Sequence, residues 1–203
     1  MLTSFWARLT GAVHPDDAHV FDDFGDDHGF NLDYPPPAYW GDVVNAPILV
    51  LDNNGGYSEE TPREFTAPDA AERHRERLRH PTALERDDAP PYYQRLNFFD
   101  WLEDGTAALV NAVAYRSIDS KARNVQVLAD RLTSARIHRR WLHEVAFPAA
   151  QRNERMLIVH RWGLWRLKKG QVTGPSIVWS SAPVSPNLTS AERSTAAAWL
   201  LSR

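Results

Sequence analysis

The feature that most constrains the fold is a continuous apolar run, Ala46–Leu51, which ends in a polar turn rich in glycine. Apolar runs of this length and composition are typical of strands that are buried on both faces of a parallel sheet. The turn that follows, Asp52–Ser58, reads DNNGGYS. Because ligands of open parallel sheets bind beyond the carboxyl ends of the strands, we expect the chemistry of this chain to begin at this turn.

Three further strands are predicted after this one, and amphipathic or charged helices separate them. Strands that alternate with helices favour an α/β fold, and we expect a three-layer αβα sandwich with a mainly parallel four-stranded central sheet. A capping box, in which Thr189 precedes Glu192 by three residues, marks the start of the last helix. The predicted strands are Ile48–Leu51, Ala107–Ala114, Met156–Val159 and Ser176–Trp179, and the clearest predicted helices are Ala70–Arg79, a helix capped by Ser120, a helix ending before Pro148, Gly163–Lys169 and Ser190–Leu201.

The first 40 residues have a different character from the rest of the chain. Residues 1–40 contain a short amphipathic stretch, Leu2–Leu9, then an acidic run and three consecutive prolines, Pro35–Pro37, which exclude a helix at that point. We interpret residues 1–40 as an acidic, proline-containing N-terminal arm and residues 41–203 as one α/β domain. The histidines and aspartates of the arm match no metal-ligand spacing, and a solvated acidic segment is the better interpretation.

The composition excludes several classes of function. The chain has no cysteine, which excludes disulfides and thiolate catalysis. It contains no apolar run long enough to span a membrane, and its first residues lack a signal-peptide pattern, so we expect a cytoplasmic monomer that does not contact membranes. Neither GxGxxG nor GxxxxGKS is present, and we expect no nucleotide cofactor, other organic cofactor or metal.

The charges are distributed unevenly along the chain. Before Ser58 many aspartates face a single arginine, Arg8, whereas between Arg116 and Lys169 basic residues dominate. Such asymmetry occurs in proteins that bind nucleic acid through one face. It is also the pattern of helices whose charges only keep them in water, and the sequence leaves both interpretations open.

Two asparagine sites suggest recognition of a polar ligand. Asn53 and Asn54 follow the first strand, and Asn111 lies within the apolar second strand. An unpaired amide buried there would cost about 1–3 kcal/mol, so Asn111 needs a hydrogen-bonding partner. That partner is either a base edge, which an amide can read with its donor and its acceptor, or a neighbouring loop. Taken alone, the turn is better explained as a strand exit in which asparagine and glycine serve only the backbone.

Four segments together resemble the motifs of the uracil-DNA glycosylase superfamily, in the branch whose first motif is a strand followed by Asn-Pro-Gly-Tyr-Ser. They occur in the family's order and cover about the last three quarters of the chain. Residues 1–40 have no counterpart. The segments are Ile48–Ser58 (ILVLDNNGGYS), Ala108–Val113 (ALVNAV), Met156–Gly170 (MLIVHRWGLWRLKKG) and Ala182–Ser190 (APVSPNLTS).

The resemblance implies a role for each matching residue. In this family a base is flipped out of DNA and its N-glycosidic bond is hydrolysed, with no metal or organic cofactor. DNA and a nucleobase-like small molecule are the implied partners. Asn54 would position the hydrolytic water, Gly56 would be the turn glycine, Asn111 would contact the base, Tyr92 or Tyr93 would stack on it, Leu188 would fill the gap in the duplex, and Ser185 and Thr189 would lie near phosphates.

The sequence departs from the family at two positions. Gly55 stands where the family has proline, and Val184 is nearest to the position of a histidine that donates a hydrogen bond to the base. Losing one donor of this kind can cost about 10²–10³ in rate. His160 ends the third strand and is a candidate replacement, although its place does not match. Two functions therefore remain open: a divergent glycosylase, or an inactive relative that binds a nucleobase, nucleic acid or protein. No GxSxG motif supports an unrelated α/β hydrolase.

Overall fold

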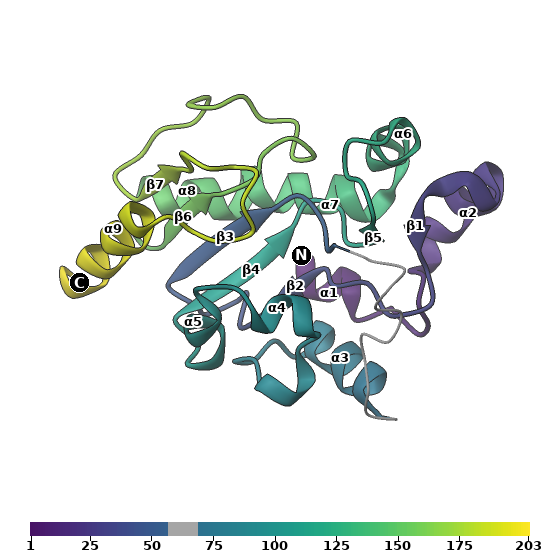
Figure 1. Cartoon of the computed structure of the whole chain (residues 1–203), viewed down its shortest axis with the longest axis horizontal. Coiled ribbons are helices and arrows are strands. Elements are labelled where there is room, and N and C mark those ends of the chain that lie inside the picture. The colour runs from purple at the N-terminus through teal and green to yellow at the C-terminus, as the bar shows by residue number, and fades with distance from the viewer. Residues whose placement is uncertain (57–68) are drawn as a thin grey trace.

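The computed structural model of the chain describes residues 1–56 and 69–203, and these form a mixed α/β structure with a mainly parallel sheet (Figure 1). The main sheet has the strand order β2-β4-β3-β6-β7, and a separate ribbon pairs β1 with β5. The strands are β1 (Phe30–Asn31), β2 (Tyr39–Trp40), β3 (Ile48–Asp52), β4 (Ala107–Asn111), β5 (Arg116–Ser117), β6 (Met156–Val159) and β7 (Ile177–Trp179).

The four predicted strands are present, but the sheet has a fifth, so the expectation of four strands is corrected. β3 pairs in parallel with both β4 and β6, and β6 pairs in parallel with β7. The additional strand β2 is antiparallel to β4 at the edge of the sheet. Gly41 turns the chain there with a φ of +84°, and a Cβ at this position would lie 2.7 Å from the carbonyl oxygen of Ala107. Only glycine permits this close approach.

The helices at Ala70–Arg79 and Ser190–Leu201 have the predicted bounds. The capping box is confirmed, because Thr189 accepts from the backbone N–H of Glu192 while the Glu192 carboxylate accepts from that of Thr189. The α-helices are α1 (Leu2–Trp6), α2 (Pro15–Phe24), α3 (Ala70–Arg79), α4 (Pro91–Gln94), α5 (Phe99–Glu103), α6 (Arg123–Arg131), α7 (Thr133–Trp141), α8 (Phe147–Gln151) and α9 (Ser190–Leu201), with 3₁₀ turns η1 (Asp26–His28) and η2 (Arg86–Asp88) and a π segment η3 (Leu142–Ala146).

Two helix boundaries differ from the predictions. The helix expected to end before Pro148 continues through it, because the π segment η3 joins α7 to α8 and Pro148 falls in the first turn of α8. Proline is tolerated in a first turn, where its missing N–H would have no helical partner. Ser120 does not cap α6, whose N-cap is Ala122.

The prediction of a short helix over Gly163–Lys169 is wrong, because the segment forms turns and no helix. Its backbone is held by other parts of the chain: the N–H of Leu164 donates to the Asn53 side chain at 3.0 Å. Arg166 has a positive φ of 60°, which no α-helix accommodates. The apolar residues of the segment, Leu164, Trp165 and Leu167, are all buried in the core.

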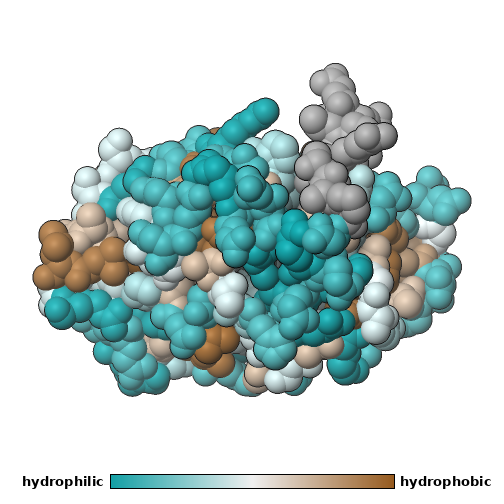
Figure 2. Space-filling view, turned by 90° about the horizontal axis from the view of Figure 1, so that it is seen from below, coloured by the Kyte–Doolittle hydropathy of each residue, from teal (hydrophilic) through white to brown (hydrophobic). Residues whose placement is uncertain are grey.

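The two faces of the sheet pack into two separate core clusters. Side chains alternate along a strand, so Leu49 and Leu51 belong to the first cluster while Ile48 and Val50 belong to the second. The first cluster includes buried side chains of α1, α6 and α7, and the second includes those of α5 and α9. The face seen in Figure 2 is mainly hydrophilic, with exposed hydrophobic atoms at the end of the molecule where α9 stops and Leu201 is 89% exposed.

The first 40 residues contribute directly to the core. Phe5 and Trp6 of α1 are buried in the first cluster. The acidic run includes helix α2, whose Asp17 is fully buried and accepts hydrogen bonds from the Tyr115 hydroxyl and the Ser134 N–H. The prolines that follow form no regular secondary structure and lead directly to β2. Within the described parts of the chain, no helix has the length and apolar character needed to cross a membrane.

Candidate functional site

The strand order defines one crevice-forming position at the carboxyl edge of the main sheet. The chain leaves β3 toward β4 on one side, and it leaves β6 toward β7 on the other. Ligands of such sheets bind where neighbouring strands are continued in opposite directions. Three segments meet at this edge: the first turn (residues 52–56), the β6 loop (residues 160–176) and the β7 loop (residues 180–189).

The asparagines of the first turn bind other parts of the protein. The Asn53 oxygen accepts from Leu164 N–H, which ties this turn to the β6 loop. Asn54 is 5% exposed and donates from Nδ2 to the Ser117 hydroxyl at 2.7 Å. Tyr57 and Ser58, the last residues of the predicted turn, lie outside the described residues.

Gly55 is required by packing. A Cβ at this position would lie 2.8 Å from Pro37 Cγ, 2.8 Å from the Tyr93 hydroxyl and 3.0 Å from Arg116 Cγ. A proline, the residue that the resemblance led us to expect here, would need these side chains to move. The next glycine, Gly56, faces the ring of Tyr92, which a Cβ would approach to 3.5 Å. The structure therefore brings Tyr92 and the first turn together.

Asn111 is the Cα partner of Asp52 across the β3–β4 pair, so the two predicted motifs are adjacent. Its side chain is fully buried and donates from Nδ2 to the carbonyl oxygen of Pro37, and Oδ1 has no hydrogen-bonding partner among the described residues. The amide thus faces the proline segment that precedes β2. A partner in a neighbouring loop was one of the two alternatives for this residue.

His138 holds the backbone at the same strand end. Its Nδ1 donates to the carbonyl oxygen of Asn111 at 2.6 Å, and its Nε2 accepts from the Trp6 indole at 2.8 Å. Burial lowers the pKa of His138 to about 4, so the ring is neutral at pH 7. This histidine supports the end of β4 and is not available as an acid or base.

An ion pair that the sequence did not reveal lies where β3 and β6 end. Asp52 is 3% exposed, and its carboxylate lies 3.4 Å from the guanidinium of Arg161. Burial, and secondly the charge of Asp52, raise the pKa of Tyr92, whereas the charge of Arg161 lowers it. The phenol is therefore protonated at neutral pH. The only signal in the sequence was that Asp52 ends one buried apolar run and Arg161 closely follows another.

The β7 loop is fastened to the end of β6. His160 is 1% exposed, and its Nε2 donates to the carbonyl oxygen of Ser185 at 2.6 Å. Its Nδ1 lies 4.0 Å from the Glu192 carboxylate, which also accepts from the Ser180 hydroxyl. Arg161 donates to the carbonyl oxygen of Val184 at 3.2 Å. His160 therefore faces the β7 loop, while the Val184 side chain is 80% exposed.

The remaining predicted site residues have structural roles. Tyr93 is 2% exposed and packs against Trp40, with 4.8 Å between ring centroids. Leu188 is 2% exposed in the second core cluster, so it does not project from the surface as a wedge would. The Thr189 hydroxyl caps α9, and the Ser185 hydroxyl accepts from the N–H of Asn187.

The chemistry open to this edge is hydrogen bonding and proton transfer. In residues 1–56 and 69–203, no three histidine or acidic side chains are grouped closely enough to hold a metal ion. A cavity of about 230 Å³ lies elsewhere, between Val43, Trp141 and Arg155 near the amino ends of β3 and β6. That cavity is at the opposite edge of the sheet from Asp52 and Arg161.

The fold and site define a mixed α/β protein with polar and ionisable side chains at the carboxyl edge of a mainly parallel sheet. A scan of family models and searches of the curated proteins and of the solved structures found no match to this chain.

Proposed function

We propose that the chain is a divergent member of the uracil-DNA glycosylase superfamily that hydrolyses the N-glycosidic bond of a flipped, uracil-like base. One observation carries the proposal. Asn54 follows β3 and Asn111 ends the neighbouring parallel strand β4, so the two asparagines that separate motifs of the resemblance single out lie at one edge of the sheet. The Tyr92 ring lies against the same turn at Gly56. In this proposal the sheet and its two sets of helices form the three-layer αβα sandwich of that superfamily.

The reaction adds water across the bond between the sugar and the base. The water oxygen bonds to the sugar C1′ as the bond to the base nitrogen breaks, and the base leaves with the bonding electrons and takes up a proton. Asn54 orients the water in this scheme, and the buried carboxylate of Asp52, two residues earlier in the chain, accepts its proton. Arg161 and the protonated phenol of Tyr92 are the donors available to the departing base. The protein acts as a cytoplasmic monomer and uses neither metal nor cofactor.

Incubation with uracil-containing single- and double-stranded DNA, followed by alkaline cleavage of abasic sites, tests this function. We expect strand breaks at uracil with the natural protein and their loss in the Asn54→Ala variant. Asn45→Ala is the matched control, because Asn45 is exposed and, in residues 1–56 and 69–203, its side chain bonds only to the nearby Asp42. No product at high protein concentration would contradict hydrolysis.

Binding without hydrolysis is a second function, and a specific observation favours it. The Asn111 amide donates to Pro37, and Tyr93 is in the core, so two of the groups expected to hold the base are used by the protein itself. Calorimetric titration with uracil-containing and matched thymine-containing oligonucleotides tests this alternative. Binding with no abasic product would support it, and neither binding nor product would exclude both functions.

A further inference from the structure

The chain that forms the β6 loop and the β7 loop contains no acidic residue of its own. No aspartate or glutamate occurs from Arg155 to Ala191, a stretch that includes the whole β6 loop and β7 loop. Two of its cations, Lys168 and Lys169, are exposed and form no ion pair with the described residues. Arg161 and Arg166 in the same loop are paired with Asp52 and Asp130. The uncompensated charge of the β6 loop is therefore concentrated at the two lysines.

Two aromatic rings lie beside these lysines. Trp162 and Trp179 form an edge-to-face pair with 5.8 Å between centroids, and both are half-buried. The Lys169 ammonium lies 5.9 Å from the centre of the Trp162 ring. Trp165, three residues later, is 1% exposed and belongs to the core. The exposed edge of the loop thus combines positive charge with a partly accessible indole.

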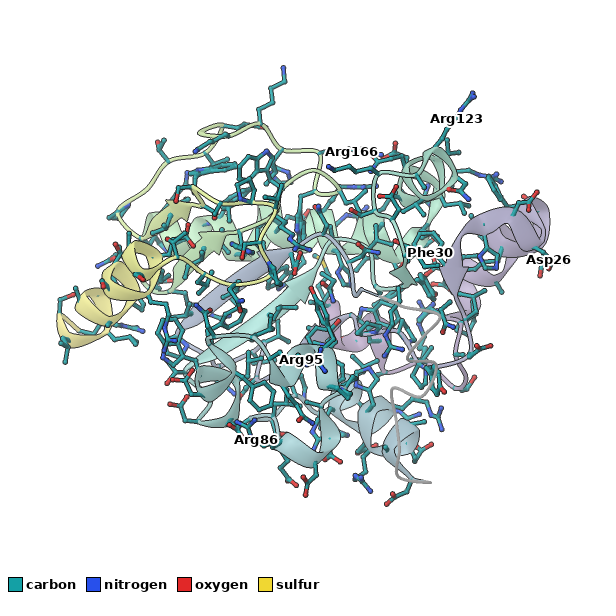
Figure 3. The ribbon with its side chains drawn as sticks, in the orientation of Figure 1. Asp26, Phe30, Arg86, Arg95, Arg123 and Arg166 are labelled. Carbon is teal, nitrogen blue, oxygen red and sulfur yellow. The ribbon has the colours of Figure 1, made fainter. Side chains whose placement is uncertain are left out.

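This surface is held rigidly. Arg166 reaches from the β6 loop to α6 (Figure 3), where it bonds to Asp130 and to the Gln126 carbonyl oxygen. The Trp179 indole donates to the carbonyl oxygen of Val172 at 2.9 Å. Because the rings are fixed before any ligand arrives, little conformational entropy is lost when a flat group stacks on them.

We propose that the β6 loop binds single-stranded nucleic acid, with Lys168 and Lys169 on phosphates and Trp162 stacked on an unpaired base. Proteins that bind single strands combine a positively charged track with aromatic stacking platforms, and stacking requires a base that is not paired in a duplex. This inference rests on the proposed function. It adds that single-stranded nucleic acid is preferred to a duplex, and it names the residues that hold it.

The test uses the full chain and a fluorescein-labelled 15-nucleotide thymidine strand, alone or paired with its adenosine complement, with anisotropy measured from 50 to 200 mM salt. We expect tighter binding of the single strand. Changing Lys168 and Lys169 together to glutamate should weaken it at least tenfold and reduce the slope of log affinity against log salt by about 1.4, since each phosphate contact contributes about 0.7.

The matched control changes Lys121 and Arg123 to glutamate. Both are exposed near the start of α6, and Figure 3 shows Arg123 projecting away from the body of the molecule. This variant alters the net charge by the same amount and should change affinity by less than threefold. An equal loss in both variants, or tighter binding of the duplex, would overturn the proposal.

Trp162→Leu separates stacking from charge, because leucine keeps an apolar side chain but has no ring. We expect roughly a tenfold loss of single-strand affinity, with Trp162→Phe retaining most of it. Unchanged affinity in a folded Trp162→Leu variant contradicts the stacking role. Single-strand binding without base release would refute the hydrolytic proposal alone, whereas base release with unaltered binding by the Lys168/Lys169 variant would refute this one alone.

Discussion

The first turn and the β6 loop follow adjacent parallel strands, but they use their side chains differently. In the first turn, Asn54 and Asp52 are nearly fully buried. In the β6 loop, Lys168 and Lys169 are exposed and make no ion pair within the described residues. The candidate chemical groups of the first turn are therefore part of the packed core, whereas the two lysines of the β6 loop are not. Substitutions in the two regions should therefore differ in their cost to stability.

The largest expected effect on stability is that of low pH, which protonates the buried histidines His74 and His138. Burial lowers the pKa of His74 to about 3 and that of His138 to about 4, whereas a histidine in the unfolded chain titrates near 6.5. The unfolded state then binds more protons below pH 6.5, so the unfolding free energy falls as the pH drops from 6.5 toward 4. His138 alone should contribute a loss of about 3 kcal/mol.

Urea unfolding at several pH values between 7 and 4.5 measures this loss. His138→Gln should flatten the dependence, whereas His143→Gln, at an exposed position in η3, should leave it as steep as in the natural protein. An equally steep dependence in the His138 variant would show that its ring is not the group that must stay neutral.

Gly55→Ala should be the next largest effect, because the added methyl group meets Pro37, Tyr93 and Arg116. Overpacking of this kind costs about 1–3 kcal/mol. Gly11→Ala is the matched control, since a Cβ there meets nothing within 4 Å. Thermal and urea unfolding of both variants measure the difference, and equal stabilities would show that the first turn is not tightly packed.

A smaller effect on stability is expected from the ion pair between Asp52 and Arg161, which connects the first turn to the β6 loop. Their carboxylate and guanidinium are 3.4 Å apart, with side chains 4% and 19% exposed. A double-mutant cycle with Asp52→Asn and Arg161→Gln should give a coupling energy of about 1 kcal/mol. A coupling indistinguishable from zero would mean that the pair does not link β3 to the β6 loop.

The smallest effect on stability should come from the β6 loop. Changing Lys168 and Lys169 to alanine removes exposed side chains without ion pairs in the described structure, so the unfolding free energy should change by less than about 0.5 kcal/mol. Urea unfolding is the measurement. A loss as large as that of Gly55→Ala would remove the distinction between the two regions.

Parts of the site could be read from the sequence because they depend on local pattern. The apolar runs located four strands, and their ends located the edge where Asn54 and Asn111 lie. The sequence could not predict that Leu188 is buried, because its 2% exposure results from packing in the second core cluster. A role as a wedge needs an exposed side chain. The helix expected at Gly163–Lys169 failed for a related reason: its backbone partner, Asn53, is more than a hundred residues away in sequence.

The sequence by itself determined the α/β class, the parallel strands and the capped last helix, since these follow from runs and spacings of neighbouring residues. Only the tertiary structure decided that the Asn111 amide donates to the carbonyl oxygen of Pro37 and that Gly55 has no room for a side chain. It also decided that Asp52 forms an ion pair with Arg161. These outcomes depend on contacts between segments distant along the chain, where packing and desolvation decide which polar groups are satisfied internally and which remain for a ligand.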